Sequence, residues 1–201
     1  MTHDAAVLKA REIASRVLAP SAGQNDKAGR FSTDAVDSLG ESGLLGLLLP
    51  VDFGGSGLGP RTFAVVTATL AEADASVAMV YLMHIVGTAT ISAARPSAAQ
   101  AVTPILQEIG AGRHLSTLAF SEAGSRSHFW APISRAHRNG NGVRINAKKS
   151  WVTSAGHAQS YVVSALAPEG AGPTDSTLYL LAADTAGLSA CGAVGRLGTS
   201  G

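Results

Sequence analysis

The stretch over residues 75–94 constrains the fold most, because it contains no Asp, Glu, Lys or Arg. An uncharged segment of this length either crosses a membrane or is buried inside a protein. Much of it is alanine, and polar residues such as Ser76 and His84 interrupt it. Few large apolar side chains are therefore left to drive membrane insertion. We predict no membrane span, but a helix over 76–94 that is buried on all sides within a helical protein, with His84 in its core.

The residues before this segment also show helical spacing. Apolar side chains recur every three or four residues over 7–18, and Pro20 is expected to end that helix and begin a loop over 21–30. Pro60 suits the first position of a further helix. The glycines just before it do not match a dinucleotide-binding turn, since proline occupies the place of the third glycine. We interpret them as a tight loop between helices.

Beyond His114 the pattern becomes that of β-strands. Asn139-Gly140-Asn141-Gly142 is a strong hairpin signal between two short apolar runs. Helices followed by strands indicate an α+β fold, with an N-terminal all-α domain over 1–113. The β-domain over 114–201 is expected to be an incomplete barrel-like or antiparallel sheet that stops at Gly198-Thr-Ser-Gly201. Its strands are predicted over 115–120, 133–137, 143–145, 150–153, 161–165 and 177–181.

The composition excludes several functional classes. The net charge is +1 and there is no run of Lys or Arg, which disfavours a nucleic-acid binder. The single cysteine, Cys191, allows neither an internal disulfide nor a Cys-based zinc site, and indicates the reducing cytoplasm. The six histidines show no compact ligand spacing, so no metal site is predicted.

Two segments carry residues suited to a flat polar ligand. From Leu118 a predicted strand leads into a loop of small, hydroxyl-bearing residues that ends at Ser127, where backbone N–H groups and hydroxyls can approach a ligand. Trp151 and Thr153 are two apart on another predicted strand, and would point to one face. An indole can stack beside an aromatic cofactor while the hydroxyl bonds its polar edge. Taken singly, each segment fits an ordinary turn or a buried tryptophan equally well.

Together with two upstream segments, they resemble the acyl-CoA dehydrogenase family over essentially the whole chain. The resemblance depends on the order and spacing of four segments. They are Gly43-Leu-Leu-Gly-Leu-Leu-Leu-Pro50, Phe53-Gly-Gly-Ser-Gly-Leu58, Leu118-Ala-Phe-Ser-Glu122 with Gly124 and Ser127, and Trp151-Val-Thr-Ser-Ala-Gly156.

The resemblance implies that the chain is part of a flavoprotein that binds FAD. Backbone groups around Phe120 and Ser121 would meet the pyrimidine side of the flavin, and Ser127 would lie near both cofactor and substrate. Trp151 would shield one flavin edge, and Thr153 would form a hydrogen bond near the reactive nitrogen. The implied cofactor-binding residues are Leu118, Phe120, Ser121, Ser127, Trp151, Val152 and Thr153.

The implied activity is that of an oxidoreductase of fatty acid metabolism acting on the CH–CH bond of an acyl-CoA. In the family, a carboxylate base removes the α-proton, the flavin takes the β-hydride, and the electrons pass to an electron-transfer partner. The family's C-terminal helical bundle supplies that base and the main oligomer contacts. The chain is expected to lack this bundle, so no catalytic residue is named, and a homo-oligomer or a completing chain is expected.

The sequence also departs from the family pattern. The family loop Thr-Glu-Pro-Gly-x-Gly-Ser-Asp is replaced here by the residues of 121–128. Arg126 and His128 either contact a different substrate head group or are surface substitutions without a functional role. Two alternatives stay open: a flavin-dependent monooxygenase of the same fold, and a non-catalytic remnant or accessory subunit.

Overall fold

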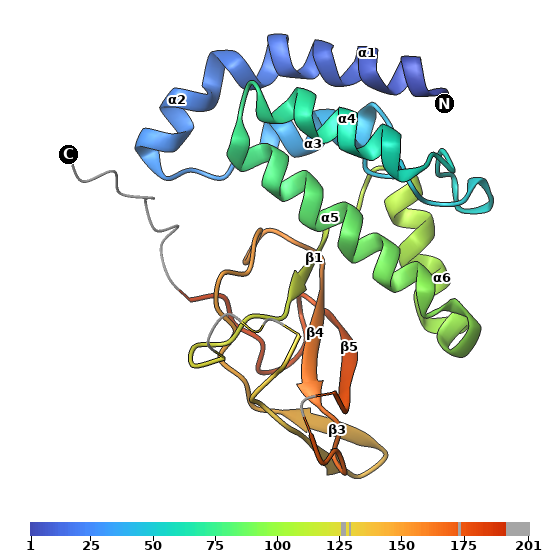
Figure 1. Ribbon diagram of the computed structural model, residues 1–201, viewed down its shortest axis with the longest axis vertical. Helices are drawn as coiled ribbons and strands as arrows, with labels where there is room; N and C mark the ends of the chain where they lie inside the picture. The colour runs from blue at the N-terminus through green and yellow to red at the C-terminus, as the bar shows by residue number, and fades with distance from the viewer. Residues whose placement is uncertain (126–127, 129, 173, 192–201) are drawn as a thin grey trace.

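The computed structural model describes residues 1–125, 128, 130–172 and 174–191, with helices first and strands second (Figure 1). This order confirms the predicted α+β class. The helices are α1 (His3–Ile13), η1 (Ala14–Leu18), α2 (Ala19–Ala28), α3 (Thr33–Glu41), η2 (Val51–Phe53), α4 (Pro60–Ala71), α5 (Ala75–Ala93) and α6 (Arg95–Gly110). The strands are β1 (Ser116–Ala119), β2 (Ala136–Asn139), β3 (Gly142–Ile145), β4 (Ser160–Leu166) and β5 (Ser176–Ala182).

The first helix does not end at Pro20, so the loop predicted over 21–30 is wrong. The chain passes from α1 through the π-helical turn η1 directly into α2, where Pro20 lies in the first turn. A π-helical turn shifts the hydrogen-bond register by one residue, and a first turn does not need the N–H that proline lacks. The helix instead ends at Gly29, which adopts the left-handed conformation with φ 60°.

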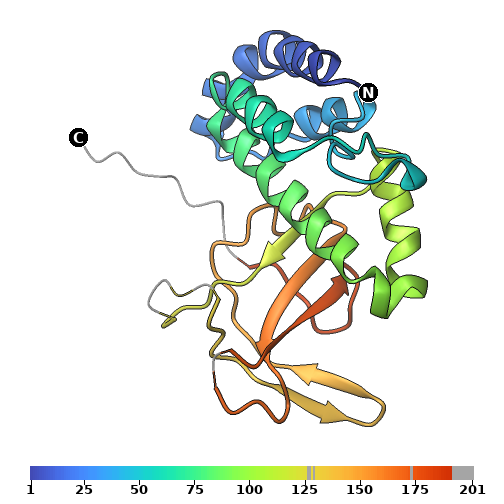
Figure 2. The ribbon, with the colours of Figure 1, turned by 45° about the vertical axis from the view of Figure 1, so that its right-hand side comes forward.

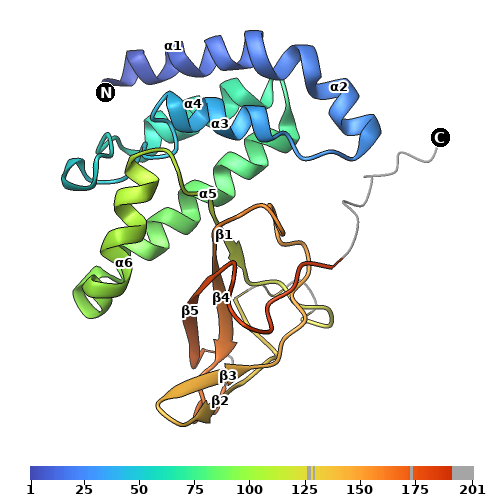
Figure 3. The same ribbon diagram turned by 180° about the vertical axis from the view of Figure 1, so that it is seen from behind.

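Helix α5 lies between the other helices and β1, as Figures 1 and 3 show. One face is buried against α4, α6 and β1 and includes Tyr81 and His84, whereas Met79 and Val86 are exposed on the other face. The prediction that this helix is buried on all sides is therefore wrong; the sequence is apolar all round, but only one face meets described residues. By length and composition α5 could also cross a membrane, a property it shares with core helices of soluble proteins.

The strands form a mixed sheet and a separate hairpin. In the sheet, of order β1-β4-β5, β4 is parallel to β1 and antiparallel to β5. The parallel pair exists because a long connection separates β1 from β4 in sequence. Strands β2 and β3 form the predicted hairpin, with Gly140 at φ 59°, and it lies at the end of the β part farthest from the helices (Figure 2).

The predicted strand over 150–153 is wrong. Trp151 has φ 56°, which an extended strand does not permit, and turns follow over 153–157. Trp151 and Thr153 are therefore not related by strand alternation. The other predicted strands are confirmed by β1 to β5, while the predicted stop at Gly198-Thr-Ser-Gly201 lies outside the described residues.

Candidate functional site

The structure brings the two predicted ligand-facing segments side by side. The N–H of Ser150 donates to the carbonyl oxygen of Ser121 at 2.9 Å, and the Thr117 hydroxyl donates to the carbonyl oxygen of Thr153 at 2.8 Å. An antiparallel bridge also joins Glu122 to Lys149. Residues 149–153 therefore run antiparallel alongside β1 and the three residues that follow it, although they form no regular strand.

Among the predicted cofactor-binding residues that the structure describes, Trp151 is the most exposed. Its side chain is 89% exposed, whereas Val152 and Thr153 are half-buried. A positive φ is uncommon for a residue with a Cβ and is retained where the surroundings enforce it. The hydrogen bonds on either side of Trp151, from Ser150 and to Thr153, provide that enforcement.

The predicted residues on β1 have a different environment. The side chains of Leu118 and Phe120 pack against the core cluster that contains Ile91 and Val162. The carbonyl oxygens of Phe120 and Ser121 already accept hydrogen bonds within the chain. A ligand would therefore meet N–H groups and the Ser121 hydroxyl here. Ser127 and Arg126 lie outside the described residues.

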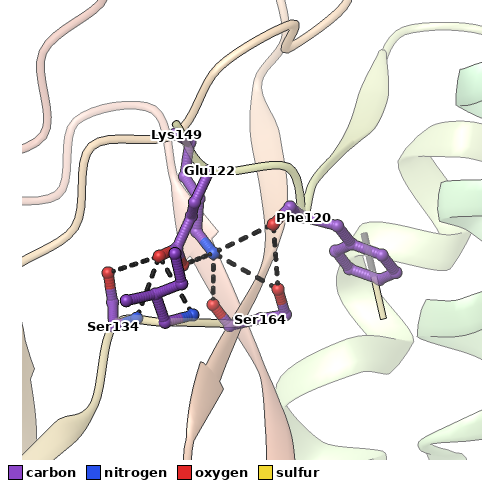
Figure 4. Close-up of polar contacts among 6 residues, drawn as sticks. Phe120, Glu122, Ser134, Lys149 and Ser164 are labelled. Atoms are coloured by element: carbon purple, nitrogen blue, oxygen red, sulfur yellow. Dashed lines mark hydrogen bonds and ion pairs between the residues drawn. The ribbon is translucent and has the colours of Figure 1, made fainter. Parts of the chain in front are cut away.

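A buried ion pair that sequence reasoning missed lies directly behind these segments (Figure 4). The Nζ atom of Lys149 lies 2.5 Å from Oε1 of Glu122, and the two side chains are only 10% and 5% exposed. The Glu122 Oε2 atom accepts hydrogen bonds from the N–H of Ile133 at 3.2 Å and from the N–H and hydroxyl of Ser134, both at 2.9 Å. The available signal was an acidic residue, Glu122, in the first ligand-facing segment and a basic residue, Lys149, just before the second, in a chain with only 14% charged residues.

The protein environment keeps Glu122 ionised. Burial raises the pKa of this carboxyl, but the hydrogen bonds from Lys149 and Ser134 outweigh burial and hold the pKa below its ordinary value. A buried carboxylate with a full set of donors is a rigid anchor, since moving it would leave several polar atoms unpaired. The pair therefore fixes the backbone on both sides of the site at neutral pH.

His84 links the helices to the start of β1. Its Nδ1 atom accepts the N–H of Ser116 at 3.0 Å, and its Nε2–H group donates to the carbonyl oxygen of Leu45 at 3.0 Å. Burial lowers the pKa of His84 to about 4, so the ring is neutral at physiological pH. This confirms the predicted core role of His84.

The sequence and the fold of the chain both match known proteins. The family model "Acyl-CoA dehydrogenase, N-terminal domain" matches residues 2–104. The chain is 26% identical over 200 residues to the probable acyl-CoA dehydrogenase FadE25 of Mycobacterium tuberculosis, covering 99% of this chain and 51% of that protein. The fold matches that of butyryl-CoA dehydrogenase from Megasphaera elsdenii with a TM-score of 0.82 at 23% identity, over 93% of this chain and 50% of the other.

A second solved structure, the FAD complex of PigA, matches with a TM-score of 0.77 at 19% identity, over 92% of this chain and 49% of that one. The chain thus spans about half the length of the proteins it matches. The family model covers half of the chain, and the four motifs that carry the resemblance lie in the expected order. The chain therefore belongs to the acyl-CoA dehydrogenase family.

Proposed function

We propose that this chain forms the flavin-lining half of an FAD-dependent oxidoreductase that acts on the CH–CH bond of an acyl-CoA thioester. One observation carries the proposal: the hydrogen bonds between Ser150 and Ser121 and between Thr117 and Thr153 bring the two segments together and leave the Trp151 indole exposed beside them. Relatives named as probable acyl-CoA dehydrogenases support the reaction class.

The described residues fit a flat aromatic cofactor. An indole that is 89% exposed offers a broad apolar surface, and aromatic rings stack on such surfaces. The Oγ atom of Ser154, close in sequence, is buried and has no hydrogen-bond partner among the residues that the structure describes. Buried polar atoms are normally paired, so this unpaired hydroxyl stands out within the segment that we propose to face the flavin.

Each predicted residue then has a separate role. Trp151 covers one flavin edge, while Val152, Thr153 and Ser121 meet its polar rim; the role implied for Ser127, near cofactor and substrate, falls outside the described residues. Leu118 and Phe120 act through the backbone, because their side chains anchor β1 in the core. When bound, FAD supplies the acceptor for the substrate's β-hydride. We assign the α-proton to no base among these residues.

The proposal extends to the location, assembly and electron acceptor of the whole protein. We propose that it works in the cytoplasm as an oligomer and passes electrons to an electron-transfer partner. Family membership supports the electron transfer, and the single, exposed Cys191 suits a reducing compartment.

A visible absorption spectrum tests cofactor binding. The purified protein is mixed with FAD, and excess cofactor is removed by gel filtration. We expect a retained flavin band that weakens in Trp151→Ala and in Thr153→Ala, since both lose contacts to the flavin. Val143→Ala, which trims an exposed apolar residue of the distant hairpin, is the control and should retain as much flavin as the wild type. No retained flavin in the wild type would contradict the proposal and favour an accessory role.

Anaerobic addition of acyl-CoA thioesters then tests the reaction class. A dehydrogenase bleaches the flavin band as the substrate is oxidised. A flavin that stays oxidised with every thioester, yet consumes oxygen once chemically reduced, would instead support the monooxygenase alternative.

A further inference from the structure

The loop over 123–132 begins and ends at a single carboxylate. Glu122 precedes the loop, and its Oε2 atom binds the N–H groups of Ile133 and Ser134, which follow it. The Ser134 hydroxyl donates to the same oxygen. One side chain therefore holds both ends of the loop together.

Lys149 connects this clamp to the proposed cofactor segments. Besides Glu122, its ammonium group reaches the carbonyl oxygen of Phe120 at 3.3 Å and the carbonyl oxygen of Ser164, on β4, at 2.5 Å. Lys149 also lies two residues before Trp151. As Figure 4 shows, its ammonium group lies among the Glu122 carboxylate, the Phe120 carbonyl group just after β1 and Ser164 of β4.

A buried ion pair is rarely favourable for stability alone, because apolar residues of similar volume often serve as well. What apolar side chains cannot do here is satisfy the N–H groups of Ile133 and Ser134 and the carbonyl oxygens of Phe120 and Ser164. The pair therefore determines the positions of these backbone groups instead of mainly adding stability. It fixes where Phe120, Ser121 and Trp151 lie while leaving the loop sequence free to change, as its departure from the family pattern illustrates.

We propose that Glu122 and Lys149 are positioning residues that set the flavin-facing backbone from Phe120 to Glu122 and from Lys149 to Trp151, and hold the backbone of Ile133 and Ser134 beside it. This inference rests on the proposed function for its flavin. Neither side chain needs to touch the cofactor, because each acts through the backbone that it holds.

Three variants test the inference. Glu122→Met has a side chain of similar length but removes both carboxylate oxygens, and Lys149→Met removes the ammonium group. Arg138→Met is the matched control, because it breaks an ion pair of the same domain, with Glu169 at 2.6 Å, whose side chains are 75% and 67% exposed. All variants are compared at neutral pH with the wild-type protein.

Two readouts separate positioning from simple folding. Hydrogen exchange of the Ile133 and Ser134 amides should become at least about tenfold faster in Glu122→Met and stay unchanged in Arg138→Met, because only the first removes the oxygen that accepts their N–H groups. The dissociation constant for FAD should rise by about tenfold or more in Glu122→Met and Lys149→Met, and the visible circular dichroism of the bound flavin should change. A thermal unfolding curve shows that each variant is folded at the temperature used.

Unchanged exchange in Glu122→Met would overturn the inference, because Glu122 would then not hold the Ile133 and Ser134 backbone. Faster exchange with wild-type FAD affinity and flavin dichroism would overturn it too, by leaving only a structural role. If the wild type binds no FAD, the proposed function fails and the positioning role fails with it, whereas the exchange data still report the clamp. The two failures are thereby distinguished.

Discussion

The side-chain hydroxyls of Tyr81 and Tyr161 differ in whether they form a hydrogen bond. The Tyr81 hydroxyl is buried and finds no hydrogen-bond partner among the described residues, and burial raises its pKa. The Tyr161 hydroxyl accepts the N–H of Gly156 at 2.9 Å. A buried polar atom without a partner lowers the stability of the fold. Removing one partner of a hydrogen bond likewise leaves the other partner unpaired.

Substituting phenylalanine at the two positions should therefore shift stability in opposite directions. We expect Tyr81→Phe to raise the free energy of unfolding by up to about 1 kcal/mol, and Tyr161→Phe to lower it by about 1 to 2 kcal/mol. Urea unfolding at neutral pH measures both. A loss of stability in Tyr81→Phe as large as that in Tyr161→Phe would show that the Tyr81 hydroxyl is paired after all.

His84 should make stability depend on pH. Its pKa of about 4 in the folded protein lies below the ordinary value near 6.5 that it regains on unfolding. The unfolded chain then binds the proton more readily, so the free energy of unfolding falls as the pH drops from about 6.5 towards 4. The difference corresponds to a loss on the order of 3 kcal/mol. Urea unfolding at several pH values across this window measures it.

Two histidine variants control this prediction. His84→Gln can keep both hydrogen bonds but cannot titrate, so it should make the pH dependence between about 6.5 and 5 shallower, leaving the part due to His114, whose pKa burial also lowers. Glu122, whose pKa is also lowered, loses its contribution only at more acidic pH, below the ordinary carboxyl pKa of about 4.3. His137→Gln, at an exposed position of β2, should keep the wild-type slope. An equal slope in all three proteins would contradict the assignment to His84.

Residues differed in how far sequence could predict them. The burial of His84 followed from the apolar residues around it, since a helix places them on the same face. The exposure and positive φ of Trp151 could not be predicted, because partners about thirty residues earlier in sequence impose them. The clamp by Glu122 was missed for the same reason, as its partners come from two segments that lie later in the sequence, at Ile133–Ser134 and at Lys149.

At the scale of elements, local signals predicted best. The β2–β3 hairpin formed as expected because its Asn-Gly turn carries its own geometry. The prediction that the first helix ends at Pro20 was wrong, because the effect of this proline depends on the preceding π-helical turn η1, for which the sequence has no local signal. The segment over 150–153 has the composition of a strand but is held by single bonds to Ser121 and Thr117 instead of a regular ladder.

The packing of α6 against η2 leads to a prediction at this scale. A Cβ atom at Gly110 would overlap the carbonyl oxygen of Phe53, and both belong to the backbone, which cannot easily yield. We expect Gly110→Ala to lower the free energy of unfolding by about 1 to 3 kcal/mol, as overpacking does. Gly23→Ala is the control, because Gly23 lies within α2 with open space around it and should gain about 0.5 to 1 kcal/mol. Thermal unfolding measures both; equal effects would contradict the close contact.

At the scale of the whole molecule, the helices help to position the candidate site. The His84 hydrogen bond fixes the first residue of β1, and Leu118 and Phe120 continue the strand into a core cluster shared with α5 and α6. The backbone groups proposed to face the flavin therefore depend on helices that lie far from them in sequence. The α+β order could be predicted from the sequence, but this shared core could not, since it arises from contacts between distant segments.

A shared core predicts that the helical and β parts unfold together. Leu106 of α6 is fully buried in the cluster that also contains Ile91 of α5 and Val162 of β4. We expect the most protected amides of α5 and β4 to exchange with the same free energy, because both open only when this cluster is lost. Leu106→Ala should lower both values equally, by about 2 to 5 kcal/mol.

Amide-resolved hydrogen exchange measures both elements in one experiment, and Val143→Ala on the exposed hairpin should change neither. If Leu106→Ala lowered the exchange free energy of α5 while β4 kept its wild-type value, the two parts would be independent folding units. The position of β1 would then no longer depend on the helices, and His84 would be a local contact. Equal losses would instead mean that a substitution in the helical core destabilises the proposed flavin face through packing alone.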